Sequence, residues 1–281
     1  TLSSPSLTPW MHRATRTPPG MQPLDAEAWL QRDACFADQM AYRDRLIARS
    51  DTDSVGVLEG AKDGVAELAS LVLKHLSNDP GYRIERRGIT RPCGRSLRRE
   101  AEPTMAFLGR LVQEDLLLLR RDEEEQEHRL IAGVLCFPSH WTLSEKLGRP
   151  LTSIHEPVPF YAGDLAKRVQ RLFDGLRVDR PLWRANWLLY PDAELHAPRR
   201  ENAPKREESA APTWLRVERQ TLLRLPRTGD VVFSIKTDLC PVASLSAEEQ
   251  AGLRAAFDEL DPAQHAYKGG AALRAGLEPA V

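Results

Sequence analysis

The chain has 281 residues, of which 42% are hydrophobic and 28% are charged, the balance of a globular protein and not of a disordered one. Its 39 basic and 40 acidic side chains nearly cancel, so the sequence carries no electrostatic footprint for nucleic acid or for an anionic membrane surface. No run approaches ~18 uninterrupted apolar residues, so we expect no membrane-spanning helix. A small organic substrate or another protein is the expected kind of partner.

Residues 1–22 are predicted to be a flexible N-terminal arm, and residues 23–281 a single domain. The arm is rich in Ser, Thr and Pro and lacks the charged-then-apolar order of a signal peptide. The cysteines are scattered and form no C-x-x-C pair, which argues against a zinc ribbon or an iron–sulfur cluster. They are Cys35, Cys93, Cys136 and Cys240. We therefore expect free thiols and a cytoplasmic protein.

Helices dominate the first part of the domain. Asp25 is a plausible N-cap for a helical run that extends to about residue 49, in which Trp29, Phe36 and Met40 recur at roughly helical spacing. Further helices are expected at about 57–76 and 103–113, the first ended by a Ser-Asn-Asp-Pro-Gly sequence.

The pattern then changes to that of strands. Two antiparallel strands are expected at 116–120 and 130–137, joined by the acidic run at 122–127. Helical segments follow near 143–147 and 161–176, then strands at 183–190, 214–225 and 231–238, and a helix at about 247–260. The last two strands form a hairpin around residues 227–230, and residues 197–213 are expected to be a mobile surface loop.

This order predicts an α+β fold. Its centre is a mainly antiparallel sheet of about five strands with flanking helices and an N-terminal helical extension. A PAS-like domain is one fold with that outline.

The most unusual peptide surrounds His155, which is followed closely by Pro157 and Pro159. Prolines fix φ and stiffen the backbone, and a stiff peptide that presents one imidazole suits an axial haem ligand. The alternative is a histidine held in a turn, which is the commoner role of a lone histidine.

The strand at 214–225 carries a guanidinium among aliphatic side chains. Alternation places Arg219 and Thr221 on a face that is otherwise apolar. A buried guanidinium needs a partner, which is either a haem propionate, a bound dioxygen, or an internal salt bridge to Glu218 or Asp238. In the strand at 183–190, Arg184 and Asn186 share a face, which either lines a polar pocket or faces water.

Other motifs are weaker. The pair Cys240-Pro241 and the peptide around Cys93 each resemble parts of thiolate-haem sites but lack their full spacing. His140 follows a strand and is expected in a surface turn. No Gly-x-Gly-x-x-Gly, P-loop or Gly-x-Ser-x-Gly motif is present, so neither a nucleotide fingerprint nor a serine-hydrolase elbow is predicted.

Six peptides in order carry a family resemblance over about residues 20–270. They are Cys136-Phe-Pro-Ser-His-Trp141, Glu145-Lys-Leu-Gly-Arg-Pro150, Ile154-His-Glu-Pro-Val-Pro159, Arg184-Ala-Asn-Trp187, Leu215-Arg-Val-Glu-Arg-Gln-Thr-Leu222 and Arg224-Leu-Pro-Arg-Thr-Gly229. Pro23-Leu24-Asp25 and Tyr267-Lys268-Gly269 fit the same pattern. Together they resemble the alpha subunit of the haem-dependent oxidative N-demethylases, also called dimethylamine monooxygenases.

The resemblance implies a PAS-like fold that holds a b-type haem with a histidine ligand. It also implies that dioxygen and a small secondary amine such as dimethylamine react there, and that the amine loses a methyl group as formaldehyde. Electrons would come from NADPH through reductase-type partner subunits that carry flavin and an iron–sulfur cluster.

The resemblance also assigns roles to residues of this chain. It gives the ligand role to His155, haem contacts to Arg219 and Trp187, and catalytic roles to Arg184, Glu218 and Arg219. Two other functions compete with a monooxygenase component: a non-catalytic haem-binding PAS-type gas or ligand sensor, and a haem-free scaffold subunit.

Overall fold

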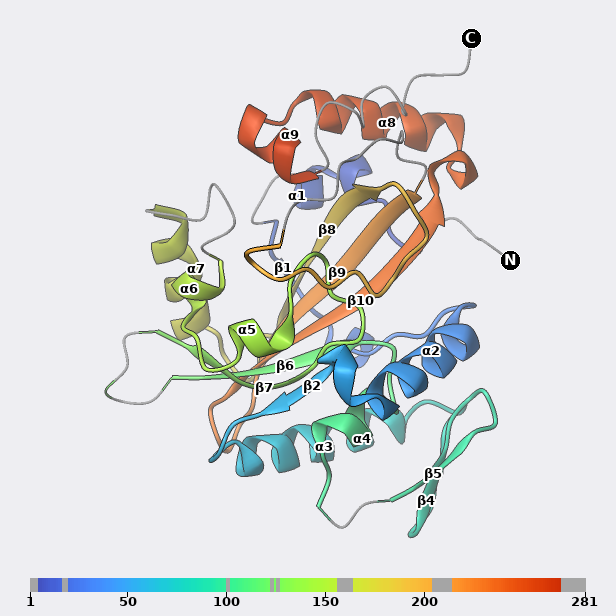
Figure 1. Cartoon of the computed structure of the whole chain (residues 1–281), viewed down its shortest axis with the longest axis vertical. Coiled ribbons are helices and arrows are strands. Elements are labelled where there is room, and N and C mark those ends of the chain that lie inside the picture. The colour runs from blue at the N-terminus through green and yellow to red at the C-terminus, as the bar shows by residue number, and fades with distance from the viewer. Residues whose placement is uncertain are drawn as a thin grey trace.

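The computed structural model describes residues 5–16, 20–99, 102–121, 124, 127–155, 164–203 and 214–268. Within these residues the centre is a seven-stranded sheet in the order β1-β8-β9-β10-β6-β7-β2, in which each pairing is antiparallel (Figure 1). Its strands are β1 Gln22–Pro23, β2 Val55–Val57, β6 Asp115–Arg120, β7 Arg129–Val134, β8 Leu182–Tyr190, β9 Trp214–Arg224 and β10 Val231–Pro241.

The five strands expected from the sequence are β6 to β10, and the predicted hairpin is β9 and β10. The estimate of about five strands was too low, because the sheet has seven. The two extra strands, β1 and β2, lie at the edges and have two and three residues. Strands this short contain too few residues to show alternation. A separate three-stranded sheet, β3 Arg83–Ile84, β4 Gly88–Thr90 and β5 Ser96–Arg98, was also missed.

Helices cover both faces of the main sheet (Figure 1). On the first face lie α2 Phe36–Ala48, α3 Lys62–Leu76, α4 Met105–Gly109 and α8 Ala247–Asp258. On the second lie α5 Leu143–Lys146, α6 Leu151–Ile154 and α7 Asp164–Asp174. We call these the α3 face and the α6 face.

Short elements complete the chain. They are η1 Pro9–Met11, α1 Arg13–Arg16, η2 Ala26–Ala28, η3 Ser50–Thr52, η4 Val242–Ser244 and α9 Pro262–Lys268. The expected helix at 25–49 is therefore two pieces, η2 and α2, with an irregular stretch between them. The Asp25 side chain caps η2 by accepting a hydrogen bond from the amide of Glu27, as its N-cap position predicted.

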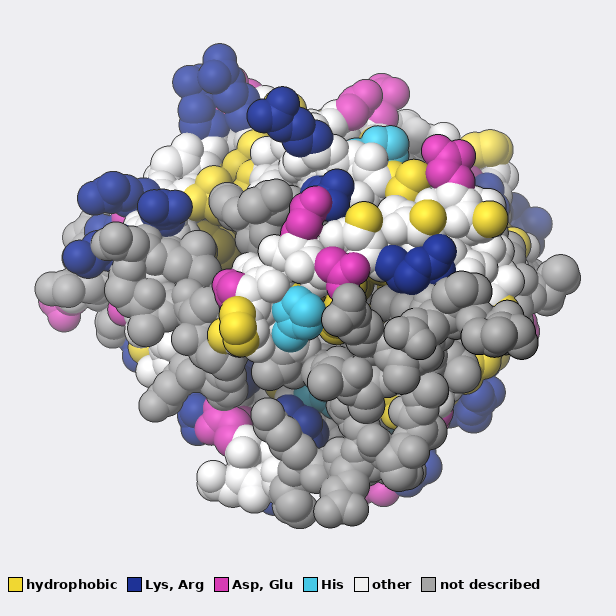
Figure 2. All heavy atoms as spheres, turned by 90° about the horizontal axis from the view of Figure 1, so that it is seen from above, with side chains coloured by type: hydrophobic (Ala, Val, Ile, Leu, Met, Phe, Trp, Pro, Cys, Tyr) yellow, Lys and Arg dark blue, Asp and Glu magenta, His cyan; other side chains and the backbone are white. Residues whose placement is uncertain are grey.

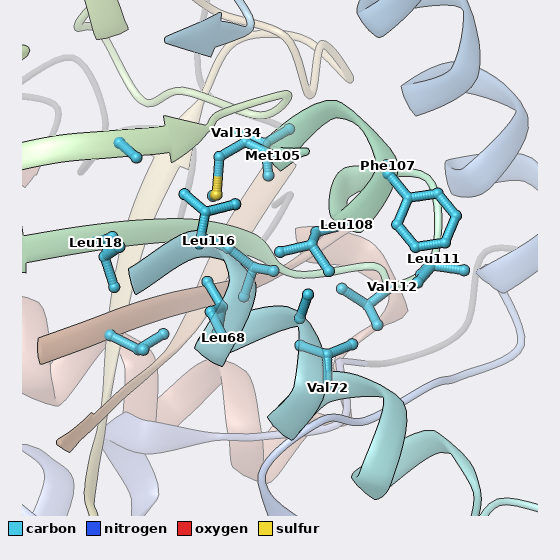
Figure 3. Close-up of a cluster of buried hydrophobic side chains, with 14 of the residues drawn as sticks. Leu68, Val72, Met105, Phe107, Leu108, Leu111, Val112, Leu116, Leu118 and Val134 are labelled. Carbon is cyan, nitrogen blue, oxygen red and sulfur yellow. The ribbon is translucent and has the colours of Figure 1, made fainter. Parts of the chain in front are cut away.

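The largest apolar cluster lies between the α3 face and the helices α3 and α4 (Figure 3). Leu68 and Val72 of α3 and Leu108 of α4 pack against Leu116 and Leu118 of β6, and all five are buried. Burying such a side chain contributes about 1.5–3 kcal/mol each, so this cluster fixes α3 and α4 against the sheet.

A buried ion pair joins α2 to β6. The Arg43 guanidinium lies 2.6 Å from the Asp115 carboxylate, and the side chains are 0% and 1% exposed. Arg43 also donates to the carbonyls of Gly109, Gln113 and Glu114. Asp115 in turn accepts hydrogen bonds from the amides of Cys136 and Phe137, just after β7. The pair therefore connects a helix, a strand and the segment that leads into α5.

Part of the N-terminal stretch is packed, contrary to the expectation of a flexible arm. Trp10 in η1 is 1% exposed, and its indole donates to the carbonyl of Glu249 in α8. Its ring also makes an edge contact with Trp187 of β8. The expectation rested on the abundance of Ser, Thr and Pro. Composition of this kind does not reveal that one tryptophan, Trp10, anchors the segment.

Among the described residues no helix is long and apolar enough to cross a bilayer. The surface seen from above carries acidic and basic side chains side by side, in keeping with the near-zero net charge (Figure 2). The expected mobile loop at 197–213 falls largely on 204–213, outside the described residues, and so do Pro157 and Pro159.

Candidate functional site

The α6 face carries a set of polar side chains that other parts of the protein bury fully or partly. Cross-strand register places Arg184 beside Gln220 and Asn186 beside Glu218, and Glu218 beside Thr237. Glu218 and Thr237 are buried, and the other three are partly buried. A sheet face facing water would not need to bury these groups, so this one is built either for an internal network or for a ligand.

Arg216 organises the network. Its guanidinium, 0% exposed, donates to Glu218 over 2.9 Å, to the carbonyl of Leu195 and to the carbonyl of Phe137. Gln220 donates to the other oxygen of Glu218 over 3.0 Å. Both carboxylate oxygens of Glu218 are thus held, which fixes the position of this negative charge.

An aromatic group borders the network. The Tyr190 hydroxyl and the Ser139 hydroxyl are 2.6 Å apart, and the His140 ring stacks on Tyr190 with ring centroids 5.0 Å apart. His140 has φ of 61°, a left-handed conformation uncommon for residues other than glycine. His140 does lie in a turn, as expected, but that turn contacts the polar network.

His155 lies at the C-terminal end of α6, as its C-cap residue. Its Nδ1 is 2.9 Å from the carbonyl oxygen of Leu151, four residues earlier. A carbonyl only accepts, so Nδ1 carries the proton and the lone pair is on Nε2. Metal-binding histidines have this arrangement, in which a backbone carbonyl holds one ring nitrogen and orients the other.

The short helix α6 is itself anchored to the residues just before β7. The amide of Leu151 donates to the carbonyl of His128, and the amide and hydroxyl of Thr152 donate to Glu127. Before α6, Lys146 and Arg149 both bind the carboxylate of Glu201. These contacts give His155 a fixed position without use of the prolines that follow it.

The electrostatic surroundings keep His155 neutral. Burial lowers the pKa of His155, and the nearby cations Lys146 and Arg184 lower it further, while the hydrogen bond to Leu151 opposes them. A neutral imidazole is the form that coordinates a metal.

Lys268 adds a buried cation that residue-by-residue reasoning did not single out. Its Nζ donates to Asn186 over 2.9 Å and to the carbonyl of Trp187 over 2.7 Å, and the side chain is 8% exposed as a residue. Burial lowers the pKa of Lys268 to about 7, and Arg184 lowers it while Glu218 opposes this. The one signal in the sequence was its place in the Tyr267-Lys268-Gly269 peptide.

The structure divides the predicted site residues between the two faces. Arg184 and Glu218 are on the α6 face, the side of His155. Trp187 and Arg219 are on the α3 face, where Trp187 packs with Trp10 and Phe257. Alternation correctly predicted which residues share a face, but not which face lies on the side of His155.

Arg219 is buried, as the sequence predicted, and its hydrogen bonds go to main-chain carbonyls. Its guanidinium donates to Trp29 over 2.9 Å and to Ala28 over 2.6 Å, and lies 5.7 Å from the centre of the Trp183 ring. These carbonyls are at the end of η2, where a cation is favourable. A salt bridge to Glu218, one of the alternatives that the sequence left open, does not form, because Glu218 is on the other face and binds Arg216.

The cysteines do not favour a thiolate ligand. Burial raises the pKa of Cys136 to about 12 and that of Cys240 to about 11, so both are neutral thiols at neutral pH. The thiolate is the form that binds metals. Cys93 is exposed, next to the three-stranded sheet.

The residues on the α6 face fit a haem group in two respects. His155 has its ring oriented and neutral, and a porphyrin, which supplies the other in-plane ligands, needs only an axial side chain. Leu151 and Ile154 of α6 belong to an apolar cluster, while Arg184 and Lys146 are cations close to His155. An apolar ring with anionic propionates matches such surroundings. Elsewhere in the described ranges, no cluster of three or more His, Cys, Asp or Glu side chains is placed to hold a metal ion.

Fold and site together define an α+β protein with a buried polar network and an oriented histidine on one face of an antiparallel sheet. The chain belongs to the family described as haem-dependent oxidative N-demethylase, alpha subunit-like, whose model matches residues 20–277. This confirms the resemblance seen in the sequence. The family name points to a haem-dependent oxidoreductase and to further subunits.

Proposed function

We propose that this chain is the haem-binding component of a monooxygenase that removes a methyl group from a small secondary amine such as dimethylamine. The observation that carries the proposal is the imidazole of His155, which is held by Leu151 and kept neutral, in a chain of this family. Haem b, when bound, would supply the redox centre for dioxygen and the amine. As the family resemblance implies, electrons would come from NADPH through partner subunits with flavin and an iron–sulfur cluster.

In this proposal the chain's residues have separate tasks. His155 would hold the haem iron through Nε2, and Arg184 would pair with an anionic part of the haem. Glu218, held by Arg216 and Gln220, provides a fixed negative charge that attracts an ammonium substrate. Lys268, neutral above a pH of about 7, accepts a proton at Nζ when the ammonium becomes the neutral amine.

The strand order supports a PAS-like fold, which we also propose. Taken in chain order, the five long strands β6 to β10 lie in the spatial order third, fourth, fifth, first, second. The helices α5, α6 and α7 form an excursion between the second and the third of them. That excursion places His155 over the sheet.

The test is a haem titration of the purified protein, followed by addition of dimethylamine. We expect a Soret band that saturates at one haem per chain and shifts when the amine is added. With NADPH and a reductase partner, formaldehyde should appear in step with amine consumption. Absence of a saturable Soret band would contradict the proposal, and a band without any amine response or turnover would favour a haem sensor.

We assign Trp187 and Arg219 structural roles, because both lie on the α3 face. Arg219→Leu should lower the free energy of unfolding by about 1–3 kcal/mol, since a buried and a partly buried carbonyl lose their donor. Its haem content should be unchanged. Arg216→Leu should cost more, about 3–5 kcal/mol, because it leaves Glu218 buried and unpaired. Urea unfolding and the Soret absorbance of each variant measure the two effects. If Arg219→Leu lost its haem and Arg216→Leu kept it, Arg219 would contact the haem after all.

Titration of Lys268 should make stability depend on pH. Its pKa is about 7 in the folded protein and near 10.5 when unfolded, so between these values the unfolded chain binds more protons. The free energy of unfolding should therefore rise with pH across that window, and the rise should vanish in Lys268→Met. Urea titrations of both proteins at a series of pH values from about 7 to about 9 give the comparison. Parallel curves for the two proteins would show that Lys268 does not titrate in this range.

A further inference from the structure

A second concave site lies away from the α6 face, between the three-stranded sheet and the helices α3 and α4. It is a cleft of about 1060 Å³. It is lined by one side of α3, by Phe107 of α4 and by a group of arginines, Arg86, Arg87, Arg98 and Arg99. Small-molecule sites commonly have volumes of about 300–1,000 Å³, so the cleft has room for a ligand of that kind.

Four of the lining residues are arginines, and all four are exposed. Arg87 and Arg99 lie directly across from each other, because the amide of Arg99 donates to the carbonyl of Arg87 over 3.0 Å. Arg98 is paired in register with Gly88, beside Arg87. Like charges on opposed strands repel each other and destabilise the sheet, so a feature of this kind needs an explanation.

Within the described part of the chain, none of the four guanidiniums has an ion pair or a side-chain hydrogen bond. Among the described residues that line the cleft there is no Asp or Glu. Two described acids close in sequence have other partners: Glu85 pairs with Arg83 over 3.1 Å, and Glu102 pairs with Lys62 over 2.9 Å.

Other arginines in the same region are paired with acids. Arg32 binds Asp79 over 2.7 Å, and Arg91, directly after β4, binds Asp44 over 2.7 Å. The four guanidiniums at the cleft therefore differ from these paired arginines close to them.

The floor of the cleft is apolar. Ala66, Ala69 and Leu73 come from one side of α3, and Phe107 comes from α4. Guanidiniums above an apolar floor match a ligand with an anionic end and an apolar or aromatic body. Arginine binds phosphate oxygens through two parallel hydrogen bonds, and four of them exceed what a single monoanion requires.

We propose that this cleft binds a small molecule that carries two or more phosphate groups on an aromatic body, the chemistry of a nucleoside diphosphate or triphosphate. Phosphates lie between the guanidiniums of Arg86, Arg87, Arg98 and Arg99, and the base lies on Leu73 and Phe107. The cleft is on the α3 face, and His155 is on the α6 face, so the main sheet separates this site from the proposed haem. The ligand is therefore an additional one and not the amine substrate.

Calorimetric titration tests the proposal, with ADP, ATP, pyrophosphate and adenosine as probes at about 0.15 M salt, where exposed charges are well screened. We expect one saturable site per chain for ADP or ATP. Pyrophosphate should bind at least tenfold more weakly because it lacks the aromatic body, and adenosine should bind weakly or not at all. The double variant Arg87→Gln/Arg99→Gln should weaken nucleotide binding at least tenfold.

The control is Arg49→Gln/Arg177→Gln, which removes the same charge from two exposed positions away from the cleft. It should bind nucleotide like the wild-type protein. Binding by His155→Ala should also be unchanged, which separates this site from the haem function.

Three results would overturn the proposal. They are no saturable binding of any probe, equal affinity in the cleft variant and in the control, and binding of mixed-sequence DNA with the same dependence on Arg87 and Arg99. The last would make the patch a nucleic-acid surface.

Discussion

Replacing Arg43 by methionine should lower the free energy of unfolding by about 3–5 kcal/mol, because the change leaves the Asp115 carboxylate buried without its counterion. Methionine fills much of the same space, so the loss is electrostatic rather than a cavity effect. The carbonyls of Gly109, Gln113 and Glu114 also lose their donor. Urea unfolding followed by tryptophan fluorescence measures the change.

Arg49→Met, at the C-cap of the same helix α2, is the matched control. Arg49 pairs with Asp51 over 2.7 Å, but the two side chains are 64% and 67% exposed. Exposed pairs contribute about 0–1 kcal/mol, so this variant should unfold nearly as the wild-type protein does. An equally small effect in Arg43→Met would show that the buried pair is dispensable.

The long elements could be predicted from the sequence because their periodicity is strong. The strand expected at 214–225 is β9 Trp214–Arg224, and the hairpin with β10 follows the predicted turn. Alternation also sorted Arg219 and Glu218 onto opposite faces. What the pattern could not supply is the environment of each face, because helices cover both of them.

The polar composition of the α6 face predicted exposure to solvent, although that face is buried. Arg216, Glu218 and Gln220 look like the solvated side of a strand, yet they satisfy one another under cover. Sequence reasoning therefore expected the haem on the side of Arg219, whereas His155 lies on the side of Glu218. The sequence did contain a signal for an internal ion pair, because Arg216 and Glu218 have opposite charges and lie two positions apart on one strand.

The three-stranded sheet escaped prediction for a different reason. Its strands have two or three residues each and carry arginines instead of an apolar stripe. Ile89, which is 0% exposed, is the main apolar anchor of its central strand. A single buried position cannot show the alternation of apolar and polar residues from which strands are predicted.

His155→Ala should purify as a folded protein that no longer retains haem. The imidazole is the group we place on the iron, and its orientation depends on the hydrogen bond between Nδ1 and the carbonyl of Leu151. Removing the ring eliminates the proposed bond to iron and the hydrogen bond to Leu151 at one C-cap position of a short helix, so the fold should persist. Haem content by absorbance, beside far-UV circular dichroism, measures both at once.

Two further measurements separate ligation from general damage. Added imidazole should restore a Soret band in His155→Ala, because it can enter the space of the lost side chain and bind the iron. His75→Ala is the control: its ring also lies near a carbonyl, that of Leu30, over 3.4 Å, but on α3 at the other face of the sheet. That variant should keep its haem. Normal haem content in His155→Ala would remove His155 from the ligand role. Equal haem loss in both variants would do the same, because His75 lies on the other face of the sheet and its loss should not affect a haem bound on the α6 face.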